Sequence, residues 1–304
     1  MDLPPPADSA ASAQAVSPAG NAAPFTLAEP AEQTAPLVFA SAHSGRDYAA
    51  AFVAAARLDP VGLRRSEDSF VDELFVAAPA HGAPLLAANF PRAFCDANRE
   101  AWELDPAMFE ETLPDWVNTT SARVGAGLGT IARVVASGES IYREKLRFAE
   151  AEQRVRTCWQ PFHQRLEALI SQTRARFGGC LLIDCHSMPA AVQPGRAGVD
   201  IVLGDAHGTT CGPRTIRLVE QVLEGLGYRV RRNDPYAGGF ITRHYGRPRE
   251  RVEAVQIELN RGLYMDETRI EKLSGFSRVQ TDMATMIATV ASAARSGALG
   301  YACA

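Results

Sequence analysis

Apolar runs alternate with amphipathic stretches along most of this chain, and the pattern predicts both strands and helices. Short apolar runs predict buried strands at residues 37–42, 85–89, 179–187, 199–203, 228–232 and 254–257. Apolar residues at helical spacing predict helices at 48–56, 68–77, 140–177, 214–226 and 280–294, the longest of them interrupted at Pro161. Strands that alternate with helices favour a three-layer α/β fold, a mixed and mostly parallel sheet flanked by helices.

Three of these predicted strands end at chemically active side chains: His43, His186 and Glu258. Active sites of open α/β sheets form at the carboxyl ends of the strands. Two imidazoles and a carboxylate are the ligands and general base that a catalytic zinc site requires. A single histidine is more often a hydrogen-bonded core residue, but both of these follow a strand directly and precede a serine, which favours metal ligation.

The other four histidines give weaker signals. His81 and His163 lie in polar or helical surroundings and are expected at the surface. His207 and His244 lie in glycine-containing loops, where they could line a cleft without binding metal.

Composition narrows the class of protein. The 304 residues carry a net charge of −4 with both signs interspersed, so no broad electropositive surface for nucleic acid is expected. The six cysteines form no CxxC pair, which favours reduced thiols in a cytoplasmic protein. No run approaches the ~20 apolar residues of a membrane span, and the first residues lack the features of a signal peptide. The Ala- and Pro-rich residues 1–33 predict a flexible tail before a single domain at 34–304.

Seven short motifs, in order along the chain, resemble those of the N-formylglutamate amidohydrolases, which are similar to zinc carboxypeptidases and aspartoacylase. They are His43-Ser44-Gly45, Ser66-Glu67-Asp68-Ser69-Phe70-Val71-Asp72, Cys95-Asp96-Ala97-Asn98-Arg99, Asp184-Cys185-His186-Ser187, Asp200-Ile201-Val202-Leu203-Gly204-Asp205, Gly238-Gly239-Phe240-Ile241-Thr242-Arg243 and Gln256-Ile257-Glu258-Leu259-Asn260-Arg261. One such motif would be weak evidence, but seven in order are strong. The resemblance spans about residues 37–297 and implies a zinc-carboxypeptidase-like, phosphorylase/hydrolase-like fold.

The resemblance also implies a set of metal ligands. His43 would be the first ligand and His186 the last, with an acidic residue between them. Carboxypeptidases place that acid three residues after the first histidine, but Arg46 stands there in this chain. The acid is therefore expected near residues 67–68, with Asp68 favoured over Glu67 because it matches the family's acidic position. Asp72 is a third candidate, which could instead support the site or cap a helix.

Two histidines and one carboxylate would hold one tetrahedral zinc ion per chain and leave a position for water. In the resembling enzymes a glutamate at the position of Glu258 moves the proton of that water to the leaving group. The alternative is that Glu258 is a surface residue in a salt bridge with Arg261.

Arginines are expected to anchor the substrate, because a guanidinium holds a carboxylate through two parallel hydrogen bonds. Arg92 and the pair Asn98-Arg99 resemble the carboxylate-binding elements of the related enzymes. Arg243 is a candidate for a second carboxylate, although a structural salt bridge is an equal alternative for this residue. For Arg92, an ordinary surface position is the equal alternative.

The resemblance implies a zinc-dependent amidohydrolase that removes an N-formyl group from an acidic amino acid, such as N-formylglutamate, to give glutamate and formate. Alternatives are a deacylase for another N-acyl amino acid, a carboxypeptidase acting on short peptides, and a non-catalytic protein that binds a carboxylated metabolite. The expected partner is a small molecule, not nucleic acid or membrane, and the oligomeric state stays open.

Overall fold

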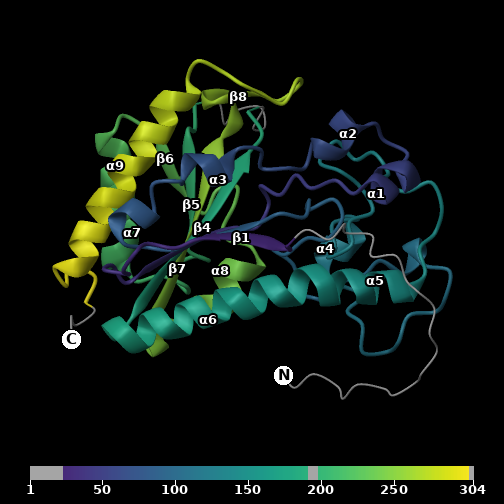
Figure 1. Ribbon diagram of the computed structural model, residues 1–304, viewed down its shortest axis with the longest axis horizontal. Coiled ribbons are helices and arrows are strands. Elements are labelled where there is room, and N and C mark those ends of the chain that lie inside the picture. Colours follow the sequence, from purple (N-terminus) through teal and green to yellow (C-terminus); the bar gives the residue numbers. More distant parts are fainter. Residues whose placement is uncertain (1–22, 191–197, 301–304) are drawn as a thin grey trace.

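A seven-stranded sheet forms the centre of the protein, whose computed structural model describes residues 23–190 and 198–300 (Figure 1). Its strands are β1 (Phe25–Ala28), β2 (Leu37–Ser41), β3 (Leu85–Ala88), β4 (Cys180–Met188), β5 (Ile201–Gly204), β6 (Val230–Arg232) and β7 (Val252–Asn260). They lie in the order β1-β3-β2-β4-β7-β5-β6. A separate two-stranded sheet pairs β8 (Met265–Asp266) with β9 (Glu271–Lys272).

The middle of the sheet is parallel. Strands β3, β2, β4 and β7 all run in one direction, whereas β1 joins β3 and β5 joins β7 in the antiparallel sense. The carboxyl ends of β2, β4 and β7 therefore meet at one edge. The register of β4 and β7 places His186 directly opposite Glu258 there.

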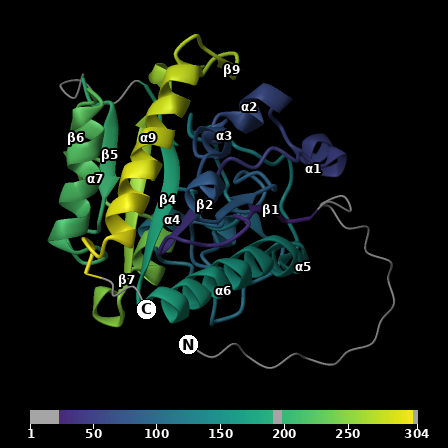
Figure 2. The same cartoon turned by 60° about the vertical axis from the view of Figure 1, so that its left-hand side comes forward.

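Helices cover both faces of the sheet, which confirms the three-layer α/β prediction (Figures 1 and 2). One face carries α3 (Val71–Leu74), α7 (Pro213–Gly225) and α9 (Phe276–Arg295). The other carries α6 (Gln160–Phe177) and α8 (Phe240–Tyr245), with α1 (Ala50–Ala55) and α2 (Pro60–Arg64) further out. Helix α5 (Phe148–Arg154) continues α6 beyond the sheet, and α4 (Ala122–Gly125) is a short helix of the segment before it.

Alternation along β4 and β7 explains how the two cores are built. Ile183 and Val255 pack with α9 on one face, and Leu182 and Ala254 pack with α6 on the other. Because both faces are buried, β4 reads as a continuous apolar run over residues 180–183, whereas β7 includes the buried polar residues Glu253 and Gln256.

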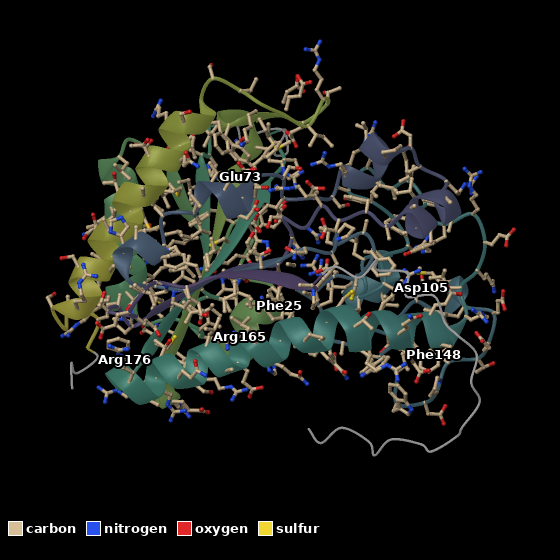
Figure 3. All side chains as sticks on the ribbon, in the orientation of Figure 1. Phe25, Glu73, Asp105, Phe148, Arg165 and Arg176 are labelled. Carbon is tan, nitrogen blue, oxygen red and sulfur yellow. The ribbon has the colours of Figure 1, made fainter. Side chains whose placement is uncertain are left out.

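The N-terminal boundary differs from the predicted tail at 1–33. Residues 1–22 lie outside the described part, but Phe25–Ala28 forms β1 and pairs with β3. Phe25 and Leu27 pack on the core. Glu29 pairs with Arg165 of α6 at 2.8 Å. Figure 3 labels Phe25 on β1 and Arg165 on α6. The tail prediction is therefore wrong from Phe25 onward. Two apolar residues at strand spacing are enough to order this segment as a strand once it can pair with the edge of the sheet.

The predicted interruption of the long helix at Pro161 is also wrong. The helix runs from Phe148 to Phe177, with a π-helical segment at Val155–Trp159 that ends two residues before the proline. Proline has no N–H to donate, and the wider π turn accommodates that loss without breaking the helix. Residues 140–147, predicted helical, are irregular instead, and the amides of Ile141 and Leu146 donate to the carbonyls of Arg133 and Met108.

The segment between β3 and α5, residues 89–147, has little regular structure and a small core of its own. This core comprises Leu104, Met108, Phe109, Leu113, Val117, Ile131, Leu146 and Ala151. The segment carries several arginines towards the carboxyl edge of the sheet. Hydrophobic periodicity does not predict its course.

The expected buried thiols are found at Cys95, Cys158, Cys180, Cys185 and Cys211, whereas Cys303 lies outside the described residues. In the described ranges, no helix is both long and apolar enough to cross a membrane. The cytoplasmic location stays a prediction.

Gly45 shows how tightly the loop after β2 is packed. A Cβ atom there would lie 2.1 Å from the carbonyl oxygen of Phe90. We expect Gly45→Ala to lower the free energy of unfolding by about 1–3 kcal/mol, because backbone atoms must move apart. In α7, Gly225→Ala is the matched control, since a Cβ there meets nothing within 4 Å. Urea unfolding of both variants measures this, and equal stabilities would contradict it.

Candidate metal centre and active site

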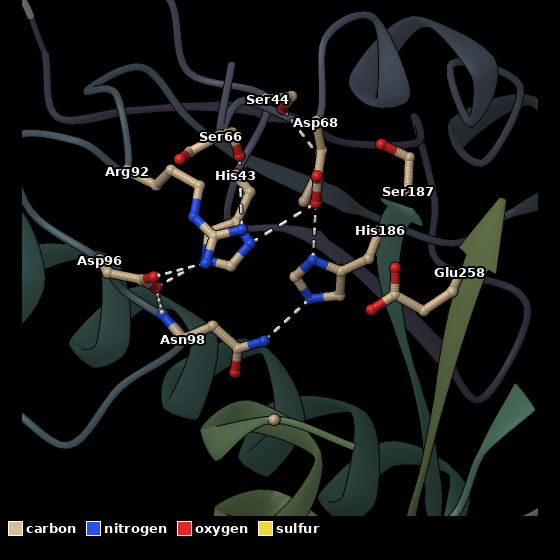
Figure 4. A network of polar contacts seen from close by, with 12 residues as sticks. His43, Ser44, Ser66, Asp68, Arg92, Asp96, Asn98, His186, Ser187 and Glu258 are labelled. Atoms are coloured by element: carbon tan, nitrogen blue, oxygen red, sulfur yellow. Dashed lines mark hydrogen bonds and ion pairs between the residues drawn. The ribbon is translucent and has the colours of Figure 1, made fainter. Parts of the chain in front are cut away.

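His43, Asp68 and His186 converge at the carboxyl edge of the sheet (Figure 4). His43 follows β2, His186 lies in β4, and Asp68 lies in the turn before α3. Asp68 Oδ2 is 2.9 Å from His186 Nδ1 and 3.5 Å from His43 Nδ1. One ligand atom from each of these buried residues falls within 4.8 Å of the others, so the group could hold a metal ion.

The Nδ1 atom of His43 supports this interpretation. It is buried and has no hydrogen-bond partner in the described part of the chain, its contact with Asp68 not meeting hydrogen-bond geometry. An unsatisfied buried nitrogen is costly, and a metal ion at this point would satisfy it.

Two further carboxylates fix the orientation of the histidines. Asp96 Oδ1 lies 2.6 Å from His43 Nε2, and Asp184 Oδ1 lies 2.8 Å from His186 Nε2. Each Nε2 then carries the proton and donates it to a carboxylate, which leaves the lone pair of Nδ1 for a metal. This carboxylate–histidine arrangement is typical of protein metal sites.

Asn98 also touches His186, with its Nδ2 atom 3.0 Å from Nε2, while its Oδ1 accepts from the amide of Ile241. An Nε2 atom that donates to Asp184 cannot also accept from Asn98. The Asn98 amide hydrogens are then available to the cavity that this residue lines.

The structure brings Asp68, and neither of its two rivals, to the histidines. Glu67 accepts instead from Arg64 at 2.7 Å and from Ser69 at 2.7 Å. Asp72 pairs with Arg46 at 3.3 Å.

Glu258 is buried, 8% exposed, and opposite His186 across the β4–β7 pair. Burial raises its pKa to about 7, and the negative charge of Asp68 adds to the rise. Gln256 Nε2 holds its carboxyl group with a 2.8 Å hydrogen bond. Arg261, suggested as its salt-bridge partner, donates instead to Asp68 Oδ1 at 2.9 Å and to Ser187 Oγ. A carboxyl group that titrates near neutrality can both accept and release a proton.

A cavity of about 450 Å³ opens in front of these groups and is rich in arginines. Arginines in its wall are Arg92, Arg99, Arg123, Arg243 and Arg261. Arg92 pairs with Asp96 at 2.8 Å, so its charge supports the orientation of His43. Arg99 is 7% exposed and donates to the carbonyls of Leu128 and Asn98. Arg243 is exposed and donates to the Gly238 carbonyl.

Residues 35–265 match the family model of N-formylglutamate amidohydrolase. The chain belongs to this family. It is 31% identical over 239 residues to an N-formylglutamate deformylase of Pseudomonas aeruginosa, covering 76% of this chain and 83% of the relative. The corresponding protein of Pseudomonas putida is 31% identical over 206 residues, 66% of this chain and 71% of its own. The crystal structure of N-formylglutamate amidohydrolase from Ralstonia eutropha JMP134 superposes with a TM-score of 0.86 at 39% identity, covering 91% and 100% of the two chains.

The sequence did not predict two carboxylates, those of Asp96 and Asp184, as parts of the site. Asp96 and Asp184 lie within the family motifs, but their contacts with the histidines depend on folding. The spacing Asp184-x-His186 was the available signal, since on a strand it places both side chains on one face.

The surface prediction for His163 is wrong. Its ring is buried on Trp159 with centroids 3.9 Å apart, Nε2 donates to the Ala97 carbonyl, and Nδ1 lies 2.9 Å from the Tyr245 hydroxyl. Burial lowers its pKa to about 3. It thereby holds the loop between Asp96 and Asn98. His207 and His244 are absent from the cavity lining as far as the described residues define it.

The carboxylates behind the histidines generate a prediction. Asp96→Asn and Asp184→Asn should each lower the affinity for a divalent metal ion by about 10- to 100-fold, because each removes the acceptor that orients a histidine. Competition with a chelator measures the affinity. Asp72→Asn is the matched control and should bind metal as the parent does. A loss in the control alone would place the acidic ligand at Asp72 instead of Asp68.

Proposed function

We propose that the protein is a zinc-dependent amidohydrolase that removes the formyl group from N-formylglutamate, giving glutamate and formate. The observation that carries this proposal is the His43, Asp68 and His186 group, which lies beside Glu258 in an arginine-rich cavity. The names of the relatives point to the same substrate. A cavity of about 450 Å³ is of the size that takes a small molecule.

Two imidazole nitrogens and one carboxylate oxygen form a donor set that suits one zinc ion per chain. When bound, such an ion polarises the amide carbonyl and lowers the pKa of water towards ~7. Asp96 and Asp184 keep the histidines in the tautomer that this requires.

In the proposed reaction, Glu258 accepts a proton from the attacking water and passes it to the amide nitrogen as the C–N bond breaks. Water thus supplies one of the two oxygens of formate, the other being the former carbonyl oxygen, and a hydrogen of the amine. The position of Glu258 opposite His186 and its pKa of about 7 suit both steps. Arg92 provides positive charge near the developing oxyanion.

Arg99 holds a substrate carboxylate in this scheme. Its guanidinium is buried, and the nearest ion-pair contact, to Asp96 Oδ2, is long at 3.9 Å. Burial lowers the pKa of Arg99, so its charge is only partly compensated within the protein. A bound carboxylate would supply that compensation through charge-assisted hydrogen bonds. Asn98 is the proposed neighbouring donor, and Arg243, which also lines the cavity, is with Arg123 one of two candidates for the second substrate carboxylate.

Hydrolysis of N-formylglutamate tests the proposal directly. We expect the metal-loaded protein to release formate, a chelator to abolish the activity, and zinc to restore it. His43→Ala and His186→Ala should lose both metal and activity. Metal analysis should give about one zinc per chain. Full activity of the metal-free protein would contradict the mechanism, and metal binding without turnover of any N-acyl amino acid would favour a binding protein.

Glu258→Gln separates proton transfer from metal binding. The amide keeps the shape of the side chain but cannot accept a proton, so kcat should fall by about 10²–10⁴-fold while zinc content is unchanged. Glu224→Gln, at an exposed position of α7, makes the same chemical change away from the cavity and should leave kcat unaltered. If Glu258→Gln retained the parent kcat, the proton would have to move through another group.

A further inference from the structure

The arginines of the cavity differ in how their charges are compensated. Arg92 and Arg261 each lie within hydrogen-bond distance of a carboxylate, Asp96 and Asp68 respectively. Arg99 has only the 3.9 Å contact with Asp96, which Arg92 and His43 already bind. The two outermost arginines, Arg123 and Arg243, have no ion-pair partner among the residues that the structure describes.

Positive charge therefore exceeds negative charge in the cavity wall. Five arginines line it, against the two carboxyl groups of Asp68 and Glu258. The excess of positive charge is greater away from the metal ligands. Arg92 and Arg261, which have carboxylate partners, are bonded to the groups around the histidines. A ligand with more than one negative charge would balance it, and a ligand with a single carboxylate would not.

Arg123 stands close to Arg99 because one residue links them. The amide of Leu128 donates to the Arg123 carbonyl at 2.8 Å, and the Leu128 carbonyl accepts from Arg99 Nε at 2.8 Å. Burial is the main cause of the lowered pKa of Arg99, and the positive charges of Arg92 and Arg123 add to the lowering. Two guanidinium groups without a carboxylate of their own thus line neighbouring parts of the wall.

The loop that carries Arg123 is well fixed. Ser121 Oγ accepts from the amide of Val124 at 3.1 Å and caps the short helix α4. The chain then turns through Gly127, which has a φ of +74°, and a Cβ at Gly129 would lie 2.2 Å from the Glu103 carbonyl oxygen. Arg123 is exposed, yet its backbone position relative to Arg99 is set by these contacts.

We propose that Arg123 binds the side-chain carboxylate of the substrate and thereby makes the enzyme select acidic N-formyl amino acids over neutral ones. This inference rests on the proposed function and adds a residue that determines specificity. The α-carboxyl carbon is three bonds from the formyl carbon, and the side-chain carboxyl carbon of glutamate is five. Arg99, next to the groups around the metal ligands, matches the nearer carboxylate, and Arg123, further out, matches the more distant one.

The test compares N-formylglutamate with N-formylglutamine, which has the same shape but a neutral side chain. We expect the parent protein to prefer the acid by about tenfold to a hundredfold in kcat/KM, the usual effect of a hydrogen bond to a charged group. Arg123→Gln should lose that preference through a higher KM for the acid, with kcat/KM for N-formylglutamine nearly unchanged. Arg123→Lys should restore part of the preference, because it keeps the charge but not the planar donor pair.

Arg214→Gln is the matched control, since it removes the same charge from an exposed position of α7 outside the cavity and should leave the preference intact. Equal losses with both substrates in Arg123→Gln would indicate a structural role and overturn the inference. An unchanged preference, or a preference that disappears only in Arg243→Gln, would overturn it as well.

Binding measurements separate this inference from the proposed function. Calorimetry with L-glutamate and L-glutamine needs no turnover, and the parent should bind the acid more tightly by a factor that Arg123→Gln removes. If the protein binds glutamate in this way but hydrolyses no N-formyl amino acid, the proposed function fails and the role of Arg123 stands. If the protein hydrolyses N-formylglutamate but Arg123→Gln does not change the preference for the acid, the proposed function stands and the role of Arg123 fails.

Discussion

The parallel pairing of β4 with β7 is the constraint on which the site depends. It runs from Cys180 opposite Val252 to Met188 opposite Asn260, through the centre of the sheet. On the face towards α6 and α8, apolar residues of both strands give way to polar ones as the strands approach the carboxyl edge. Because side chains alternate between faces, a shift of one residue in either strand would separate His186 from Glu258 and place an apolar residue beside the ligands.

Compensation of buried charge explains much of what surrounds this pair. The carboxylates of Asp68, Asp96 and Asp184 are buried. Asp96 and Asp184 each accept from Nε2 of a histidine and from a second donor, Arg92 or Thr242, and Asp68 accepts from Arg261. Burying a charge is tolerated when such partners are present. Among the described residues that line the cavity, the groups left without full compensation are Nδ1 of His43 and the guanidinium groups of Arg99, Arg123 and Arg243. A cation would satisfy the first and an anionic substrate the others, so the unsatisfied groups describe the missing ligands.

The parts of the site that the sequence predicted are those set by local pattern. His43, His186 and Glu258 each follow an apolar run, and strand order alone brings such positions together. Contacts that depend on residues 89–147 were not predicted, because that segment has no hydrophobic periodicity and is positioned by bonds such as those of Leu128. His163 was mispredicted for a similar reason. A polar residue in a helix is expected at the surface, but His163 is buried and makes two hydrogen bonds that the sequence pattern does not show.

In the proposed mechanism, catalysis and specificity come from different parts of the fold. The metal-ligand group and Glu258 are held mainly by the sheet, whose register leaves little freedom. The proposed carboxylate contacts of Arg99 and Arg123 come from the irregular segment between β3 and α5, held by loop hydrogen bonds and its own small core. Changes in that segment can alter which side chain the cavity accepts without moving the strands. In this proposal the reaction depends on the sheet, and the choice of substrate depends on the loops that face it.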